Sequence, residues 1–371
     1  MARTTASRRL KPILLRVVLL SGSLLFALVL AEFGIRLIAP QTLALNYTEW
    51  DPYVGFKNRP NASGFFRSAE FTMKVHINST GQRDREFSLA KPAGTYRVVV
   101  LGDSFTFGHG VAENETYSKR LERNLTEILH RPVEFINMGV GKSGTAHELA
   151  LWRKLARHYE ADLVLVGFCL GNDFNDNLVG VFRLEKGELV HQATRYSSIR
   201  RMQVITQAVP FYSWLAQHSH LVNLVRSLLT QMDDRTRKRE ASTGGRDEEA
   251  QPGADSKDFG YGVSYVELTT FAKEVTDSGR SFGVVFIPDL SALIRAENSR
   301  PDDYDRMATR FREAIQASGV KSIDLVPTFL RLRQEQRDRR WYYEMDQHWT
   351  AEGHRAAADE IAKWVASEFI K

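Results

Sequence analysis

The pattern of hydrophobic positions changes twice along this 371-residue chain. From Pro12 to Ala31 the residues are apolar or small, with Arg16 as the one charge, and apolar residues continue to Ile38. About twenty such residues are enough for one helix to cross a bilayer. Residues 41–94 then form an irregular stretch with one alternating segment, Phe71–Ile77, which is typical of a half-buried strand. We expect this stretch to be a small β-rich lead-in to the main domain.

The remaining residues, 95–371, predict a doubly wound α/β domain with a parallel sheet. Short apolar runs, rich in β-branched residues, indicate strands buried on both faces, and amphipathic stretches between them indicate covering helices. We expect Val98–Leu101 to lie in the central strand. The predicted strands are Arg97–Leu101, Val133–Met138, Leu163–Cys169, Phe282–Ile287 and Ser322–Leu325. The clearest predicted helices are Thr116–Leu129, Thr145–Tyr159 and Ala351–Phe369.

An insertion at 180–262 interrupts this alternation. Residues 182–191 predict a hairpin, and residues 221–228 carry apolar side chains at helical spacing. Residues 233–258 are rich in charge and contain no large apolar residue, so we expect them to be disordered. The insertion could be a lid over the functional site or a surface elaboration, because long connections are found in both roles.

The positive charge of the chain is concentrated ahead of the apolar N-terminal stretch. The formal net charge is +5, and five basic residues precede the first acidic one: Arg3, Arg8, Arg9, Lys11 and Arg16. Without these five, 45 basic residues remain against 45 acidic ones, so we expect no nucleic-acid partner. Basic residues beside a span stay in the cytoplasm. This predicts a cytoplasmic tail at 1–11, a single-pass inner-membrane anchor at 12–38 and a periplasmic remainder. A signal peptide cleaved near Ala31 is the alternative.

Four polar segments stand at the ends of predicted strands or before the last helix. They are Gly102-Asp103-Ser104, Asn137–Thr145, Gly171-Asn172-Asp173 and Asp346-Gln347-His348. The carboxyl ends of parallel strands share one edge of the sheet, which is where open α/β sheets bind ligands. We therefore expect the four segments to meet, although 242 residues separate Ser104 from Asp346.

These segments contain the groups that acyl transfer through a serine requires. Ser104 would be the nucleophile, His348 the base that takes its proton, and Asp346 the group that orients the imidazole. The negative charge that develops on the substrate also needs N–H donors. The expected donors are the backbone N–H of Ser104, a backbone N–H at Gly141 or Lys142, and the side-chain amide of Asn172.

Other polar residues near these segments have simpler explanations. Asp103 is expected to cap a helix and Asp173 to be structural. The histidines near the segments are expected to be ordinary, partly exposed side chains; they are His109, His147 and His354. A phosphate-binding loop at Gly141-Lys142-Ser143 is excluded, because Ile136 stands where that motif needs a glycine.

With these four segments in this order, the sequence resembles the SGNH (GDSL-type) hydrolases, in particular membrane-anchored bacterial members associated with cell-surface polysaccharide. The resemblance covers roughly residues 70–178 and 260–370. It implies a flavodoxin-like sheet and esterase or acyl-transfer activity without a metal or organic cofactor. The sequence departs from the family where Lys142 replaces a glycine and where Asp346 precedes His348 by two residues, since many members have three.

The resemblance thus predicts a serine esterase that removes or transfers an ester-linked acyl group, above all acetyl, on a surface or secreted carbohydrate. Two alternatives stay open. A polysaccharide O-acyltransferase would share every step up to the acyl-enzyme, and a non-enzymatic module of a polysaccharide assembly machine would share only the fold. The expected partners are an acylated carbohydrate or another ester, the membrane and, under the last alternative, polysaccharide-assembly proteins.

Overall fold

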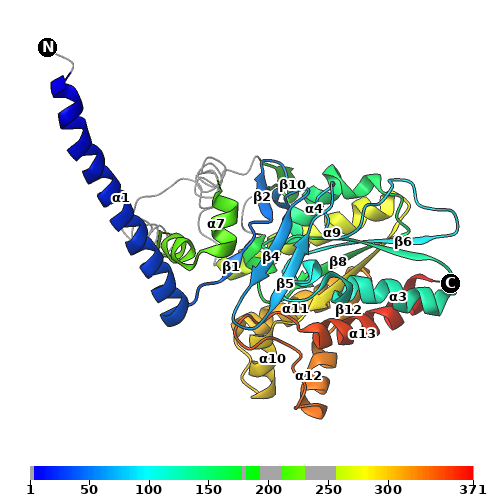
Figure 1. Cartoon of the computed structure of the whole chain (residues 1–371). Coiled ribbons are helices and arrows are strands. Elements are labelled where there is room, and N and C mark those ends of the chain that lie inside the picture. The colour runs from blue at the N-terminus through cyan, green and yellow to red at the C-terminus, as the bar shows by residue number, and fades with distance from the viewer. Residues whose placement is uncertain (1–3, 178–180, 193–210, 230–255, 371) are drawn as a thin grey trace.

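The computed structural model describes residues 4–177, 181–192, 211–229 and 256–370, and Figure 1 shows their arrangement. Helix α1 (Thr4–Ile38) projects away from the sheet and its covering helices. Within the described residues, the stretch Leu15–Ile38 of α1 is the one long and apolar enough to cross a membrane, and none of it is buried. A membrane anchor and a signal sequence both have this length and composition.

Five parallel strands form the central sheet, and the predicted doubly wound α/β fold is confirmed. The strands are β6 (Tyr96–Gly102), β7 (Val133–Gly139), β8 (Leu163–Cys169), β11 (Ser281–Ile287) and β12 (Ser322–Asp324). They pair in the order β7-β6-β8-β11-β12. β7 is added on one side of β6, whereas β8, β11 and β12 follow on the other side, so the gap between the carboxyl ends of β6 and β8 is the switch point of the sheet. The expectation that β6 is central is wrong, because the third strand returns past the first and β8 takes the middle position.

Successive side chains of β6 point into two separate hydrophobic cores, one on each face of the sheet. This explains the unbroken apolar run of the strand. Val98 and Val100 pack under helices α3 (Tyr117–Leu129) and α13 (Ala351–Phe369), which lie side by side on one face. Val99 and Leu101 belong to the opposite core. The helices of that second face are α4 (Thr145–Lys154), α9 (Ser256–Asp277) and α11 (Asp303–Ala317).

Several predicted boundaries differ from the structure by one residue or more. The helix expected over Thr145–Tyr159 ends at Lys154, where Leu155 leaves the helical conformation, and a 3-10 turn follows at Ala156–His158. The last strand ends at Asp324, because Leu325 already begins helix α12 (Val326–Glu335). The remaining short elements are α2 (Ser104–Phe107), a 3-10 turn at Glu113–Glu115, α5 (Asp173–Asp176) and α10 (Leu290–Glu297).

The lead-in forms two small antiparallel sheets. One contains β1 (Leu43–Ala44), β4 (Ser63–Arg67) and β5 (Thr72–His76), and the other contains β2 (Thr48–Asp51) and β3 (Gly55–Asn58). Strand β5 is the alternating stretch that the sequence predicts. Its inward residues Met73 and Val75 pack, together with Ile77, on Phe107 of α2. The lead-in is therefore in contact with the turn that carries Ser104.

The described parts of the insertion contain a hairpin and two helices. The predicted hairpin is present as β9 (Phe182–Glu185) and β10 (Glu188–His191), and helix α7 (Tyr212–His218) is followed by a helix over 220–229. Of the stretch expected to be disordered, residues 233–255 lie outside the described residues. For residues 256–258 the expectation is wrong, because α9 begins at Ser256, with the serine and early acidic residue typical of a helix start.

Candidate active site

Ser104 is the first residue of α2 and follows directly after β6. The chain turns at Gly102, where a Cβ would lie 2.1 Å from Oγ1 of Thr106, so no larger residue fits without displacing that side chain. Asp103 caps α2 as predicted, with its Oδ1 accepting the N–H of Phe105 at 2.9 Å. This tight turn places the Ser104 hydroxyl at the switch point of the sheet, where ligands of doubly wound proteins bind.

His348 and Asp346 reach Ser104 from the loop between α12 and α13. Nε2 of His348 lies 2.6 Å from Oγ of Ser104, and Nδ1 lies 2.6 Å from Oδ1 of Asp346. Gln347, between the two, adopts a left-handed conformation with φ of 67°, so the loop turns sharply there. The three residues that the sequence singles out for catalysis are thus brought into one hydrogen-bonded line across 244 positions of the chain.

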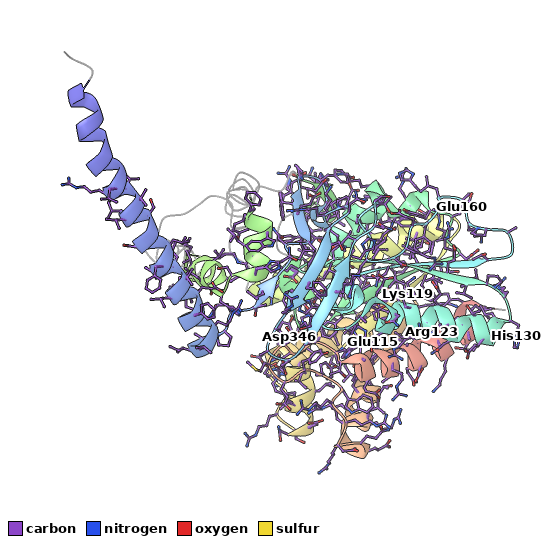
Figure 2. The ribbon with its side chains drawn as sticks, viewed as in Figure 1. Glu115, Lys119, Arg123, His130, Glu160 and Asp346 are labelled. Carbon is purple, nitrogen blue, oxygen red and sulfur yellow. The ribbon has the colours of Figure 1, made fainter. Side chains whose placement is uncertain are left out.

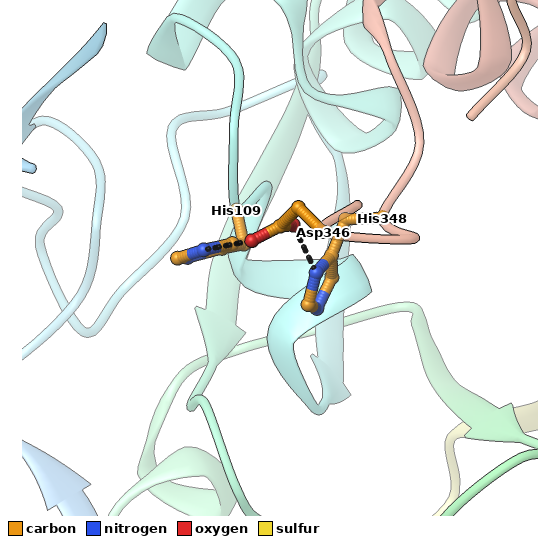
Figure 3. Close-up of side chains that lie close together, drawn as sticks. All are labelled: His109, Asp346 and His348. Carbon is orange, nitrogen blue, oxygen red and sulfur yellow. Dashed lines mark hydrogen bonds and ion pairs between the residues drawn. The ribbon is translucent and has the colours of Figure 1, made fainter. Parts of the chain in front are cut away.

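A second histidine faces the other oxygen of the Asp346 carboxylate (Figure 3). Nε2 of His109 lies 3.5 Å from Oδ2 of Asp346, and Nδ1 lies 3.5 Å from the Tyr47 hydroxyl. The expectation that His109 is partly exposed is wrong. It is 8% exposed, because the rings of Phe66 and Phe71 from the lead-in pack edge-on against it.

The loop that carries Asp346 is attached to the lead-in by Glu70, in the turn between β4 and β5. The Glu70 carboxylate accepts the backbone N–H groups of Glu344, Met345 and Asp346 at 2.8, 3.0 and 2.8 Å. Figure 2 shows Asp346 at the end of β4 and β5 where this turn lies. Sequence reasoning missed both Glu70 and the contact of His109. Only His109 carried a signal, since it follows Ser104 by five residues.

The surroundings of Asp346 keep its carboxyl group ionised. Partial burial by itself would raise its pKa, but hydrogen bonds from His109 and His348 outweigh burial and hold the pKa well below its usual range. Burial lowers the pKa of His109, although its bond to Asp346 opposes this change. A negative carboxylate between two imidazoles stabilises positive charge on whichever ring takes up a proton.

The loop after β7 contains Gly141 and Lys142, the two residues expected to offer a backbone donor. Gly141 is buried, whereas Lys142 is exposed and lines the same cleft as Ser104. Lys142 has φ of 68°, in the left-handed region that favours glycine. Within the described residues, the backbone N–H groups of Ser104, Gly141 and Lys142 donate to no protein group, and of these three residues Ser104 and Lys142 line the cleft.

Asn172 lies at the cleft beside Ser104, and one hydrogen of its amide is already bonded. Nδ2 donates to Oδ2 of Asp176 at 2.6 Å. An amide nitrogen carries two hydrogens, so the second remains available as a donor to a ligand.

Behind the nucleophile lies a group of buried carboxyl groups. Burial raises the pKa of Asp103 to about 6, and burial together with neighbouring acids raises the pKa of Glu148, Asp173 and Glu267 well above the usual range. Asp173 has the structural role expected of it, because its Oδ2 accepts the N–H of Cys169 at 2.9 Å. These carboxyl groups stay protonated more readily than exposed ones, since burial disfavours the charged form.

His147 and His354 are also buried rather than partly exposed, which corrects the sequence expectation. His354 is completely buried on α13 and accepts the N–H of Tyr117 at its Nδ1, 3.2 Å away. Burial lowers the pKa of His147 to about 4 and that of His354 to about 3. Their positions on the inner faces of α4 and α13 explain the burial, and neither contacts Ser104.

A cleft of about 630 Å³ opens over Ser104 and His348. Its lining includes Phe105 of α2, Cys169 at the end of β8 and residues that follow β11. The polar side chains that line it include Asn172, Asp176, Asp289, Arg295, Asp302 and Gln347. A cleft with this many hydrogen-bonding groups suits a polar substrate.

Among the described residues, one set of side chains has the spacing of a metal site: His109, Asp346 and His348 offer ligand atoms within 4.8 Å of one another. The shortest contact in this set is the 2.6 Å bond between His348 and Asp346. That bond leaves Nε2 of the imidazole facing Ser104, an arrangement suited to proton transfer.

Comparison with family models identifies the C-terminal part of the chain. Residues 256–371 match the model described as SGNH hydrolase-like domain, acetyltransferase AlgX. This stretch is SGNH hydrolase-like. The match confirms the resemblance for the second of the two stretches that the sequence indicates, and the parallel sheet is that of an SGNH-like α/β fold.

Solved structures of low sequence identity are also similar to this chain. A lipolytic protein of the G-D-S-L family from Veillonella parvula DSM 2008 has 12% identity and a TM-score of 0.40, over 74% of this chain and 99% of that one. The acetyl xylan esterase AlAXEase has 14% identity and a TM-score of 0.42, over 73% and 98%. The lipase/acylhydrolase from Enterococcus faecalis has 12% identity and a TM-score of 0.41, over 73% and 96%. No curated protein matches the sequence.

Proposed function

We propose that this chain is a serine esterase of the SGNH type in which Ser104, His348 and Asp346 form the catalytic triad. The observation that carries the proposal is the line of two 2.6 Å contacts from Ser104 Oγ through the His348 ring to the Asp346 carboxylate. A hydroxyl, an imidazole and a carboxylate in this line are the arrangement by which a serine becomes a nucleophile.

The reaction proceeds through an acyl-enzyme. Nε2 of His348 takes the hydroxyl proton as Oγ of Ser104 attacks the ester carbonyl, while Asp346 holds the proton on Nδ1 and stabilises the imidazolium. The carbonyl oxygen becomes negative and is bound by the free backbone N–H groups near Ser104 and Lys142, with the Asn172 amide as a further donor. The ester C–O bond then breaks and the departing alkoxide takes the proton from His348.

The acyl group leaves the enzyme by the same steps in reverse. His348 takes a proton from an acceptor hydroxyl, the acceptor oxygen attacks the acyl carbonyl, and Oγ of Ser104 regains its proton from the imidazolium. With water as the acceptor the protein is an esterase. With a sugar hydroxyl it is an O-acyltransferase, and this second candidate is favoured by the matched family model, whose description includes acetyltransferase.

We propose an acetyl ester on a carbohydrate as the substrate. The description of the matched family supports acetyl as the transferred group. The polar lining of the cleft supports a hydroxyl-rich carrier, because each sugar hydroxyl can both donate and accept a hydrogen bond. The N-terminal apolar helix and the basic residues ahead of it support a periplasmic domain held at the inner membrane by one span.

The test is to incubate the full chain with an acetylated oligosaccharide, with and without an unacetylated acceptor, and to follow both free acetate and acetylated acceptor. An esterase releases acetate at a rate independent of the acceptor, whereas a transferase acetylates the acceptor faster than it releases acetate. Ser104→Ala is the control and should remove both activities. If the unaltered protein is as inactive as Ser104→Ala, the result would instead support a non-enzymatic module that acts with polysaccharide-assembly proteins.

A further inference from the structure

The helix over 220–229 of the insertion lies against the C-terminal end of α1 rather than over the candidate active site, as Figure 1 shows. The helix before it, α7, packs on β1 and β4 of the lead-in. The contact with α1 is made by Glu32. Its carboxylate accepts the hydroxyl of Ser219 at 2.8 Å and the backbone N–H groups of His220 and Leu221 at 2.9 Å each.

The position of Glu32 in α1 is unusual for an acidic residue. It lies inside the apolar stretch Leu15–Ile38, six residues before its end. At 1.5 Å per residue this is about 9 Å along the helix. A carboxylate at such a depth is costly unless it is paired. The three donors at the start of the 220–229 helix, together with the positive end of that helix, provide most of the pairing, and Arg36 on α1 lies 3.9 Å from Oε1 of Glu32. A fourth bond, from the N–H of Gln41 to Nδ1 of His220 at 2.8 Å, attaches the same segment just beyond α1.

The outward surface of these two helices is apolar. Their exposed large apolar side chains have exposed fractions between 47% and 80%; they are Phe211, Trp214, Val225, Leu228 and Leu229. Val225, Leu228 and Leu229 are spaced three and four apart, so they form one stripe along a helix. Residues 211–229 contain no acidic residue and one arginine, Arg226.

We propose that residues 211–229 lie beside α1 at the periplasmic interface of the lipid bilayer, with this apolar surface inserted among the lipids. Three observations support a lipid partner. The surface continues that of a helix apolar enough to span a membrane, Glu32 fixes it within the last turns of that helix, and it contains a tryptophan, which favours the membrane interface. The inference rests on the proposed anchoring by α1. It gives the insertion the role of holding the catalytic domain in a defined orientation on the membrane.

The test uses the full chain with one environment-sensitive fluorophore on an introduced cysteine. The only native cysteine, Cys169, is buried and is replaced by alanine in the background. Leu228→Cys reports on the apolar stripe, and Lys363→Cys on α13 is the matched control, because that side chain is 74% exposed on a polar helix face. The labelled chains are reconstituted into phosphatidylethanolamine–phosphatidylglycerol vesicles that contain lipids brominated near the glycerol end of the acyl chain.

The expected result is blue-shifted emission at position 228 that the brominated lipids quench, with red-shifted and unquenched emission at position 363. Flotation of the same vesicles reports separately on the anchor. If the chain floats but both probes show red-shifted, unquenched emission, the proposed span stands and the interfacial position of the insertion is refuted. A blue shift at 228 without lipid quenching would mean that protein covers the stripe, and it would overturn the inference as well. A chain that does not float refutes both proposals.

Discussion

The two sides of the candidate active site are held in place in different ways. On the nucleophile side, Ser104 is positioned first by its neighbours in sequence: the buried strand before it, the Gly102 turn and the Asp103 cap. The lead-in adds only packing on Phe107, at the far end of α2. On the base side, the loop of Asp346 and His348 is positioned by contacts from far away in the chain. Glu70 binds three of its backbone N–H groups across 274 to 276 residues.

The difference shows that the lead-in helps to hold the proposed catalytic residues in place. The nucleophile side depends on the sheet and would keep its geometry without the lead-in residue Glu70. The base side depends on the lead-in for Glu70 and for the rings that bury His109. Substitution of Glu70 should therefore act on proton transfer by His348, whereas the turn that carries Ser104 should keep its geometry.

The largest effect is expected for Asp346→Asn, which removes the carboxylate that bonds the His348 ring. Asparagine can hold the imidazole in the wrong tautomer and carries no charge to stabilise the imidazolium, so kcat should fall about 10⁴-fold. The measurement is hydrolysis of an aryl acetate by the purified chain, with thermal unfolding as the check on folding. A loss of less than about 10-fold would mean that Asp346 does not serve His348.

Glu70→Gln should have the second largest effect, although Glu70 does not touch His348. The neutral amide has fewer acceptor positions for the three N–H groups, so the loop should shift and kcat should fall by up to about 10²-fold with little change in KM. Glu86→Gln is the matched control, since Glu86 is a lead-in glutamate that accepts from Ser79 at 2.8 Å, away from the site. Equal activity of the two variants would show that the loop does not need the lead-in.

This contrast also explains how much could be predicted from sequence. The strand ends, the Gly102-Asp103-Ser104 turn and the Asp-x-His segment are short local patterns, and the shared edge of a parallel sheet brings them together. The attachment of the base loop could not be predicted, because Glu70 stands in an irregular turn whose partners are backbone N–H groups. The burial of His109 depends in the same way on the docking of the lead-in.

The nucleophile side should show a dependence of stability on pH through its buried acids. Burial and the neighbouring Glu148 raise the pKa of Glu267, so the folded state keeps a proton that the unfolded state releases above about pH 4.3. The folded state then binds more protons, and stability falls as pH rises, by up to about 1.4 kcal/mol per pH unit until the folded pKa is reached. Glu267→Gln removes this contribution. Unfolding curves at pH 5, 6 and 7 should diverge in favour of the variant, and parallel pH dependence would contradict the account.

The smallest effect is expected for Lys142→Gly, in the loop after β7. Glycine adopts the left-handed conformation of residue 142 without strain, so the variant should gain up to about 1 kcal/mol in the free energy of unfolding. The backbone N–H that faces the cleft is retained, so esterase activity should stay within about threefold. Denaturant unfolding and aryl acetate hydrolysis check the two statements. A large loss of activity would give the lysine side chain itself a role in binding.

The most direct test of the central claim is covalent labelling of the full chain with a serine-directed fluorophosphonate, followed by peptide mass mapping. The account predicts one modified serine, Ser104, with no labelling of Ser104→Ala. It also predicts much slower labelling of Asp346→Asn, because His348 must take the proton as Oγ attacks phosphorus. Labelling at another serine, or no labelling of the folded chain, would contradict the assignment of Ser104 as the nucleophile.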